Sequence, residues 1–310
     1  MGTHLAKRLL ETKRFQTVHL ADIRESPLRG TPGITTSITD VRTEIPTDLL
    51  AEQPEWVFNL AAVHREPGHQ ASEFFETNIK GARHVCAYAE NVQCQNIYFT
   101  SSIAIYGPAR VPIAEDRLPM PITAYGSSKY PAELIHQNWL AAKEGRRLII
   151  SRPGVIYGPG DPGNIMRMIK AIRRGYFAFP GSKSIHKSYA YIYGFLDSIF
   201  FTMNRPEPLL VYNYVETPTE TIDQITEKVK MHFNSKAPIL SLPSSFLLPV
   251  SRLLQYVAGN SNPIHPVRVK KAGTPTNIVP QKLLTLGFPF QYDFAKSITH
   301  WQSIAPEDFA

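Results

Sequence analysis

The chain has 310 residues, of which 43% are hydrophobic, and it carries a formal net charge of +7. This size holds one large domain or two modest ones with a sizeable core. Lysine and arginine are scattered without a basic run of five residues, which argues against a nucleic-acid partner. No apolar run reaches the roughly 18 residues of a membrane span. A protein that handles phosphate-bearing small molecules fits this composition.

The two cysteines indicate the redox compartment. Cys86 and Cys94 lie on or near one predicted helix and lack the spacing of metal ligands. Reduced thiols in a cytoplasmic enzyme are therefore favoured over a disulfide, and no metal site is expected.

The first predicted element is an amphipathic helix over residues 2–12, with Leu5, Leu9 and Leu10 on one face. The next stretch, "TVHLADIR", predicts a buried strand that ends in an acidic residue. No strand leads into the helix. The opening therefore has the pattern of the second half of a larger unit.

The rest of the first half alternates apolar runs with helical patterns, which argues for a parallel sheet covered on both faces. Helices are predicted at about 71–91 and 124–143. The predicted strands are Val18–Ile23, Ile34–Val41, Trp56–Ala62, Asn96–Ser102 and Leu148–Pro153.

After residue 155, proline and glycine become dense and the strands become isolated. This pattern predicts a smaller, irregular region at the carboxyl ends of the sheet, where open α/β folds bind substrates. The apolar segment 246–259, "FLLPVSRLLQYVAG", is interrupted by Pro249 and Arg252. It predicts a buried or lid helix, with contact to a membrane surface as the alternative.

The segment "ITAYGSSKYPAEL" carries the most informative chemistry. Tyr125 and Lys129 stand four residues apart and share one face of a helix. A phenol needs a pKa shift of about three units, roughly 4 kcal/mol, to ionise at neutral pH. An ammonium one turn away, together with a positively charged nicotinamide ring, could supply it. The spacing alone also occurs by chance as an exposed helical pair.

Two flanking segments strengthen this interpretation. Upstream, "NIYFTSSIAIYG" is an apolar strand that ends at Ser102, whose hydroxyl could bond the substrate oxygen that gains or loses a proton. Downstream, "IISRPGVIYGPGD" is a strand that runs into a Pro/Gly loop. Serine, Tyr-x-x-x-Lys and Arg-Pro-x-x-x-Tyr-Gly-Pro are unlikely to occur in this order and spacing by accident.

On these motifs the sequence resembles the extended short-chain dehydrogenase/reductase superfamily, and within it the NAD-dependent epimerase/dehydratase group that acts on nucleotide sugars. The resemblance implies a Rossmann-type doubly wound parallel sheet over 1–155, to which 189–214 returns. It implies a smaller irregular substrate-binding region over 156–310. Tyr125 is implied as the general acid/base. Lys129 would lower its pKa and hold the nicotinamide ribose, and Ser102 would polarise the reacting oxygen.

The implied cofactor is NAD. Asp22, at the end of its strand, would accept hydrogen bonds from the adenosine ribose, whereas Arg24 could attract a 2′-phosphate and make NADP the less favoured alternative. Gly2 resembles the last glycine of a Gly-x-x-Gly-x-x-Gly turn, in front of a helix whose N-terminus binds the pyrophosphate. The further expected cofactor contacts are Asp40, Val41, Leu60, Ala61, Ala62, Asn78, Tyr125, Lys129 and Pro153.

The substrate side follows the resemblance less closely. Lys187 precedes "SYAYIY" at a place where relatives hold a nucleotide diphosphate. His186 is a neighbouring candidate, and Arg268 is a more distant one. Val155 stands where many nucleotide-sugar members have a substrate-binding asparagine. Ile103 and Ala104 stand where dehydratases have an acidic pair, so dehydration is disfavoured.

The expected function is therefore a homodimeric NAD-dependent nucleotide-sugar epimerase. Val155 and the apolar segment 246–259 keep open a dehydrogenase or reductase of a steroid-like or keto-sugar substrate. A non-catalytic family member is the third possibility, because the sequence lacks the first strand and the first two glycines of the phosphate-binding turn. We expect from this that the start codon was assigned too late and that the given chain would bind NAD weakly.

Overall fold

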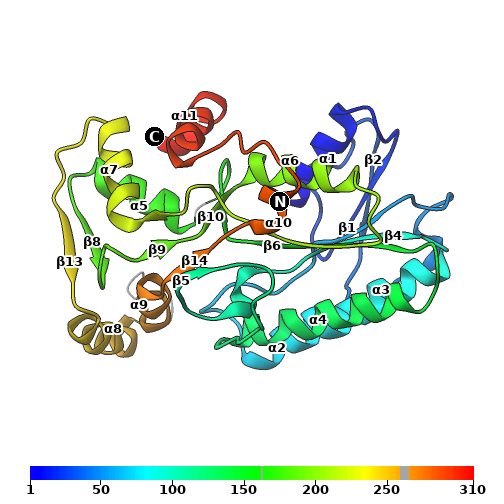
Figure 1. Cartoon of the computed structure of the whole chain (residues 1–310), viewed down its shortest axis with the longest axis horizontal. Coiled ribbons are helices and arrows are strands. Elements are labelled where there is room, and N and C mark those ends of the chain that lie inside the picture. The colour runs from blue at the N-terminus through cyan, green and yellow to red at the C-terminus, as the bar shows by residue number, and fades with distance from the viewer. Residues whose placement is uncertain (162, 259–264) are drawn as a thin grey trace.

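The computed structural model describes residues 1–161, 163–258 and 265–310. It confirms an α/β fold in which helices cover both faces of a parallel sheet (Figure 1). On one side lie α2 (Ala71–Phe75), α3 (Gly81–Asn91) and α4 (Ala124–Ala141). On the other lie α1 (Gly2–Glu11) and α6 (Ile192–Met203).

The main sheet has four parallel strands in the order β11-β6-β4-β3. Its central strands read as continuous apolar runs because both of their faces are buried. The pairing of β11 with β6 returns a distant segment of the chain to this sheet. The strands are β3 (Val57–Asn59), β4 (Asn96–Thr100), β6 (Arg147–Pro153) and β11 (Leu209–Tyr214).

A second parallel pair is formed by β1 (Val18–Asp22) and β2 (Ile34–Ile38). Among the described residues, this pair does not share a sheet with the four strands of the main sheet. β2 and β3 each end three residues earlier than predicted, at Ile38 and Asn59. Past β2, the Thr39 amide still donates a hydrogen bond to the Asp22 carbonyl of β1 at 2.9 Å, but the following residues belong to no strand.

The second half is built from helices and short strand pairs. Beyond those already named, its helices and strands are β7 (Val155–Tyr157), α5 (Asn164–Arg173), β8 (Phe177–Pro180), β9 (His186–Lys187), β10 (Tyr189–Tyr191), β12 (Glu220–Thr221), α7 (Ile222–His232), β13 (Ile239–Leu242), α8 (Ser244–Ala258), α9 (Pro266–Gly273), β14 (Thr276–Ile278), α10 (Gln281–Thr285) and α11 (Phe294–Ile304). β5 (Ala109–Ile113), from the first half, pairs with β14.

The apolar segment predicted as a buried or lid helix forms α8, apart from residue 259, which lies outside the described residues. The helix is confirmed, but burial is wrong for three of its large side chains. Phe246 is 62% exposed, Leu253 66% and Tyr256 91%. The reason is that α8 lies on the surface and packs on the neighbouring helix α9.

Two further expectations can be compared with the structure. Cys86 and Cys94 are both buried free thiols, as predicted. Within the described ranges, no helix combines the length and the apolar character that crossing a membrane requires.

Candidate active site

Tyr125 lies in the first turn of α4. The Thr123 hydroxyl caps this helix by accepting a hydrogen bond from the Gly126 amide at 3.1 Å. Gly126 packs so closely on the carbonyl oxygen of Ala104 that a Cβ at this position would overlap it. The missing side chain therefore lets α4 approach the segment that follows β4, which brings Tyr125 toward Ser102.

Ser102 follows the carboxyl end of β4, where its Oγ accepts a hydrogen bond from the Ala104 amide at 3.1 Å. This bond orients the hydroxyl toward α4. Burial raises the pKa of Tyr125 to about 12, and a side-chain hydrogen bond with Ser102 opposes the rise. Tyr125, the expected general acid/base, and Ser102, which is expected to polarise the reacting oxygen, thus lie together.

Lys129 lies one turn after Tyr125 and is buried. Its Nζ stands 4.3 Å from the centre of the Phe99 ring, a cation–π arrangement. Burial lowers the pKa of Lys129 to about 7, and the negative charge of Glu133 opposes this fall. Glu133 is itself buried and paired with Arg152 at 2.7 Å. The ammonium of Lys129 is therefore held in an apolar setting with one acidic group nearby.

The N-terminus of α1 fits a pyrophosphate. No side chain caps it, and its first turn has no acidic residue, so its amide groups remain available to an anion. A Cβ on Gly2 would meet one atom within 4 Å, Cδ1 of Leu60 at 3.9 Å, which leaves open space at this end of the helix. Gly2 thus leaves room for another group to approach the backbone closely.

The end of β1 fits an adenosine ribose. Asp22 is exposed there and accepts a hydrogen bond from the Arg24 amide at 3.0 Å. The Arg24 guanidinium lies 3.8 Å from the same carboxylate, so both groups are available at this edge. These positions, together with Lys129, can hold the two riboses and the pyrophosphate of a dinucleotide.

Asn78 is buried and joins two parts of the site. Its side chain bonds both backbone groups of Val63, at 3.1 and 3.2 Å, and the Ser128 hydroxyl at 2.7 Å. It therefore holds the loop after β3 against α4. That loop begins with Leu60, Ala61 and Ala62, directly past the end of β3.

The other expected cofactor positions lie at strand ends. Asp40 follows β2 and is paired with Arg42 at 2.6 Å. The carbonyl of Val41 accepts a hydrogen bond from His84 at 2.7 Å. Pro153 is the buried last residue of β6.

Lys187 does not present a free charge in this structure. It is half-buried in β9, and its Nζ donates to the carbonyl oxygens of Lys271 and Thr274 at 3.0 and 2.8 Å. Burial, and then the charge of Lys271, lower the pKa of Lys187 to about 8. It thereby fastens the end of α9 to β9. His186 is its half-buried neighbour, and Val155 is 40% exposed in β7.

Arg268 belongs to a cluster that sequence reasoning largely missed. Burial, and then the positive charge of Arg268, lower the pKa of Arg167, while Asp161 opposes and Arg65 adds to the fall. Arg65 and Arg268 are thus near enough to Arg167 to change its pKa, and guanidinium groups gathered in this way suit a polyanion such as a diphosphate. Arg65 and Arg167 stand in no recognisable motif, so only the fold could reveal them.

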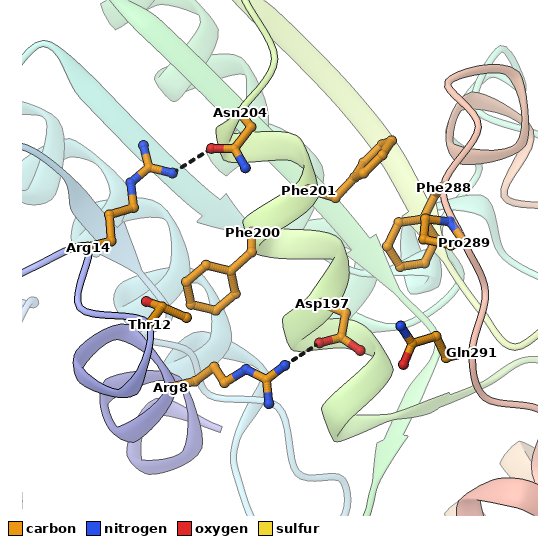
Figure 2. A pocket seen from close by; sticks show the side chains of 10 residues that line it. All are labelled: Arg8, Thr12, Arg14, Asp197, Phe200, Phe201, Asn204, Phe288, Pro289 and Gln291. Carbon is orange, nitrogen blue, oxygen red and sulfur yellow. Dashed lines mark hydrogen bonds and ion pairs between the residues drawn. The ribbon is translucent and has the colours of Figure 1, made fainter.

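The hollow drawn in Figure 2 is a different region. It lies between α1, α6 and the segment around Pro289, and none of its lining residues is a candidate site residue. Its two arginines are already engaged, since Arg8 pairs with Asp197 and Arg14 donates to Asn204, each at 2.8 Å. This hollow is therefore not part of the candidate active site.

Comparison with known proteins identifies the family of the chain. The family model of the NAD dependent epimerase/dehydratase family matches residues 1–209. A curated protein of Escherichia coli O157:H7, N-acetyl-alpha-D-glucosaminyl-diphospho-ditrans,octacis-undecaprenol 4-epimerase, is 31% identical over 300 residues. That match spans 94% of this chain and 89% of the relative.

Solved structures show the same fold. A UDP-glucuronic acid 4-epimerase from Bacillus cereus, in complex with UDP-glucuronic acid and NAD, superposes with a TM-score of 0.77 at 16% identity, over 99% of this chain and 96% of the other. A UDP-glucose 4-epimerase from Thermotoga maritima, with UDP-glucose, gives 0.74 at 17% identity, over 98% and 96%. The Rossmann-type fold expected from the sequence is thus confirmed.

Proposed function

The chain belongs to the NAD dependent epimerase/dehydratase family, and from this we propose that it is a 4-epimerase of a sugar carried on a diphosphate. Membership makes it an NAD-dependent enzyme. The observation that carries the proposal is the meeting of Tyr125, Lys129 and Ser102 at the carboxyl edge of the sheet. The relative that is 31% identical over most of both chains is named as a 4-epimerase, which supports the same reaction.

In the proposed reaction, each residue of the site has a separate role. NAD, when bound, supplies the acceptor and donor of the hydride. Ser102 holds the reacting oxygen, and Tyr125 takes its proton and later returns it. Because burial raises the pKa of Tyr125 to about 12, the phenolate needs positive charge beside it at neutral pH. The ammonium of Lys129, one helical turn away, supplies part of that charge.

The carrier of the sugar is either a nucleotide or a lipid. The sequence analysis favoured a nucleotide sugar. The curated relative is named for a sugar on diphospho-undecaprenol, which makes a polyprenyl carrier the second candidate. Both carriers include a diphosphate, for which Arg167 and Arg268 offer adjacent positive charges. The exposed apolar side chains of α8 favour the lipid carrier.

A direct test supplies UDP-N-acetylglucosamine or polyprenyl-diphospho-N-acetylglucosamine, with NAD, and measures conversion at C4 by NMR. Epimerisation of either supports the proposal. Tyr125→Phe should lower the rate by about 10²–10⁴-fold, the usual contribution of general acid/base catalysis. Tyr130→Phe, on the same helix, is the matched control and should leave it unchanged. Full activity of Tyr125→Phe would overturn the assignment, and net NADH accumulation would indicate a dehydrogenase.

Two further expectations complete the proposal. We infer a homodimer and a cytoplasmic location from the resemblance to the family. Light scattering of the purified chain measures the first, and fractionation of cells that express it measures the second.

A further inference from the structure

α8 turns an apolar stripe toward solvent. Phe246, Pro249, Leu253 and Tyr256 are all exposed. Their spacing of three, four and three residues places them on one face of the helix. Ser251, in contrast, is buried. An ordinary surface helix has the reverse arrangement, with its apolar stripe facing the core.

The segment of the sequence that carries this stripe is basic. Between Glu227 and Asp293 the sequence contains no acidic residue. Arg252 on α8 and Lys270 on α9, the helix on which α8 packs, are exposed. The basic residues of this acid-free segment are Lys228, Lys230, Lys236, Arg252, Arg268, Lys270, Lys271 and Lys282.

α9 connects the stripe to the active site. Lys271, in its last turn, forms an ion pair with Glu66 at 2.5 Å. The other oxygen of Glu66 accepts a hydrogen bond from the Tyr125 amide at 3.4 Å. Arg268, near the start of α9, belongs to the arginine cluster that suits a diphosphate. α9 thus lies next to the exposed stripe on α8 and also carries Arg268 of the anion site and Lys271, which is linked through Glu66 to Tyr125.

We propose that α8 and α9 dock the protein on the surface of an anionic phospholipid bilayer. The stripe enters the interface between headgroups and acyl chains, while Arg252 and Lys270 contact the phosphate groups. The role of this contact, delivery of a polyprenyl-carried sugar to the site, rests on the proposed function. The carrier's chain stays in the bilayer, and its diphosphate lies next to α9.

A second copy of the chain is a poorer occupant of this face. A symmetric dimer through α8 would bring two acid-free basic segments together, and like charges across an interface oppose association. An anionic bilayer provides the opposite charge and an apolar layer for aromatic and aliphatic side chains at once.

The test is flotation of the purified full-length chain with vesicles. Vesicles of phosphatidylcholine and phosphatidylglycerol in equal amounts should bind the chain, and vesicles of phosphatidylcholine alone should bind it at least tenfold less. Phe246→Ser combined with Leu253→Ser should lower binding to the anionic vesicles at least tenfold, because most of the inserted apolar surface is lost. Arg252→Gln with Lys270→Gln should weaken binding and reduce its dependence on salt.

Matched controls remove exposed apolar side chains elsewhere. Ile38→Ser on β2 and Met231→Ser on α7, which are 64% and 72% exposed in the parent, should bind vesicles like the parent. If the Phe246→Ser/Leu253→Ser variant binds anionic vesicles as well as the parent does, the proposal is wrong. A dimer that dissociates in that variant, without vesicle binding by the parent, would assign the stripe to a second copy instead.

The result is separable from the proposed function. Vesicle binding is measured without substrate. If the chain binds anionic vesicles but has no epimerase activity, the docking surface is supported and the epimerase assignment is wrong. If the chain epimerises UDP-N-acetylglucosamine but does not bind vesicles, the epimerase assignment is supported and the docking surface is wrong. The α8 variants should retain the parent rate on that nucleotide sugar and lose rate on the polyprenyl substrate in vesicles.

Discussion

The ammonium nitrogen of Lys129 lies 4.3 Å from the centre of the Phe99 ring, in the buried space between α4 and β4. Phe99 is the fourth residue of β4, and Lys129 lies one turn into α4. The strand therefore supplies the ring that this lysine contacts. A buried charge is costly, and such groups are concentrated at functional sites, which supports the proposed role of Lys129.

Lys129→Met should raise stability and lower activity. Burial lowers the pKa of Lys129 from 10.5 to about 7, so the unfolded chain holds more protons between these values. The free energy of unfolding should then rise with pH from about 7 to 10.5, by up to about 5 kcal/mol. Urea unfolding at pH 7 and pH 9 measures this rise, and Lys129→Met should abolish it.

The control for this variant is Lys129→Arg, whose charge stays on at every accessible pH. It should be less stable than the parent at both pH values. A parent whose stability does not change over this range would contradict the assignment. The epimerase rate of Lys129→Met should keep rising with pH above neutrality, since Tyr125 then ionises without the ammonium.

Gly126→Ala should separate the two proton-handling side chains. The new Cβ would overlap the carbonyl oxygen of Ala104, so α4 must move away from the segment that contains Ser102. We expect a rate loss of about 10²-fold, the scale reported for small misplacements of reacting groups. Gly145→Ala lies where an added Cβ meets no atom within 4 Å, but its positive φ adds strain, so it controls for stability loss alone. Equal rates in both variants would contradict the argument.

Glu216→Gln should remove a pH-dependent loss of stability. Glu216 accepts hydrogen bonds from Tyr157 at 2.5 Å and Ser297 at 2.8 Å, and burial raises its pKa from 4.5 to about 7. The folded chain holds more protons between these values, so the free energy of unfolding should fall by about 3 kcal/mol as pH rises from 4.5 to 7.

Glutamine keeps the accepting oxygen and carries no charge. The free energy of unfolding of the Glu216→Gln variant should therefore not change between pH 4.5 and 7, and it should exceed that of the parent at pH 8. Urea midpoints at pH 5 and pH 8 measure the difference. Glu216→Ala should be less stable than Glu216→Gln at both, because it leaves both hydroxyl donors without their acceptor.

Asp22→Ser should shift the cofactor preference. The carboxylate at the end of β1 is available to the adenosine ribose, and Arg24 remains to attract a 2′-phosphate. We expect the affinity for NAD to fall about tenfold, the scale of one charge-assisted hydrogen bond, and NADP to gain relative to NAD. Titration calorimetry with both cofactors measures the ratio. Glu25→Ser, which removes a carboxylate paired with Arg29, is the control and should leave the ratio unchanged.

The sequence by itself determined the fold class and the residues of the proposed chemistry. Buried parallel strands read as continuous apolar runs, and a helix of 3.6 residues per turn places Tyr125 and Lys129 on one face whatever surrounds them. Such local rules also located β1, β4 and β6 within one or two residues.

Only the tertiary structure decided which distant groups meet. The contact of Gly126 with Ala104, the pairing of Lys187 with the end of α9, and the cluster of Arg65, Arg167 and Arg268 join segments far apart in the chain. The exposure of α8 belongs here too, because apolar periodicity marks a helix face without saying what covers it. Burial is a property of the packed neighbours, and these are set by the fold as a whole.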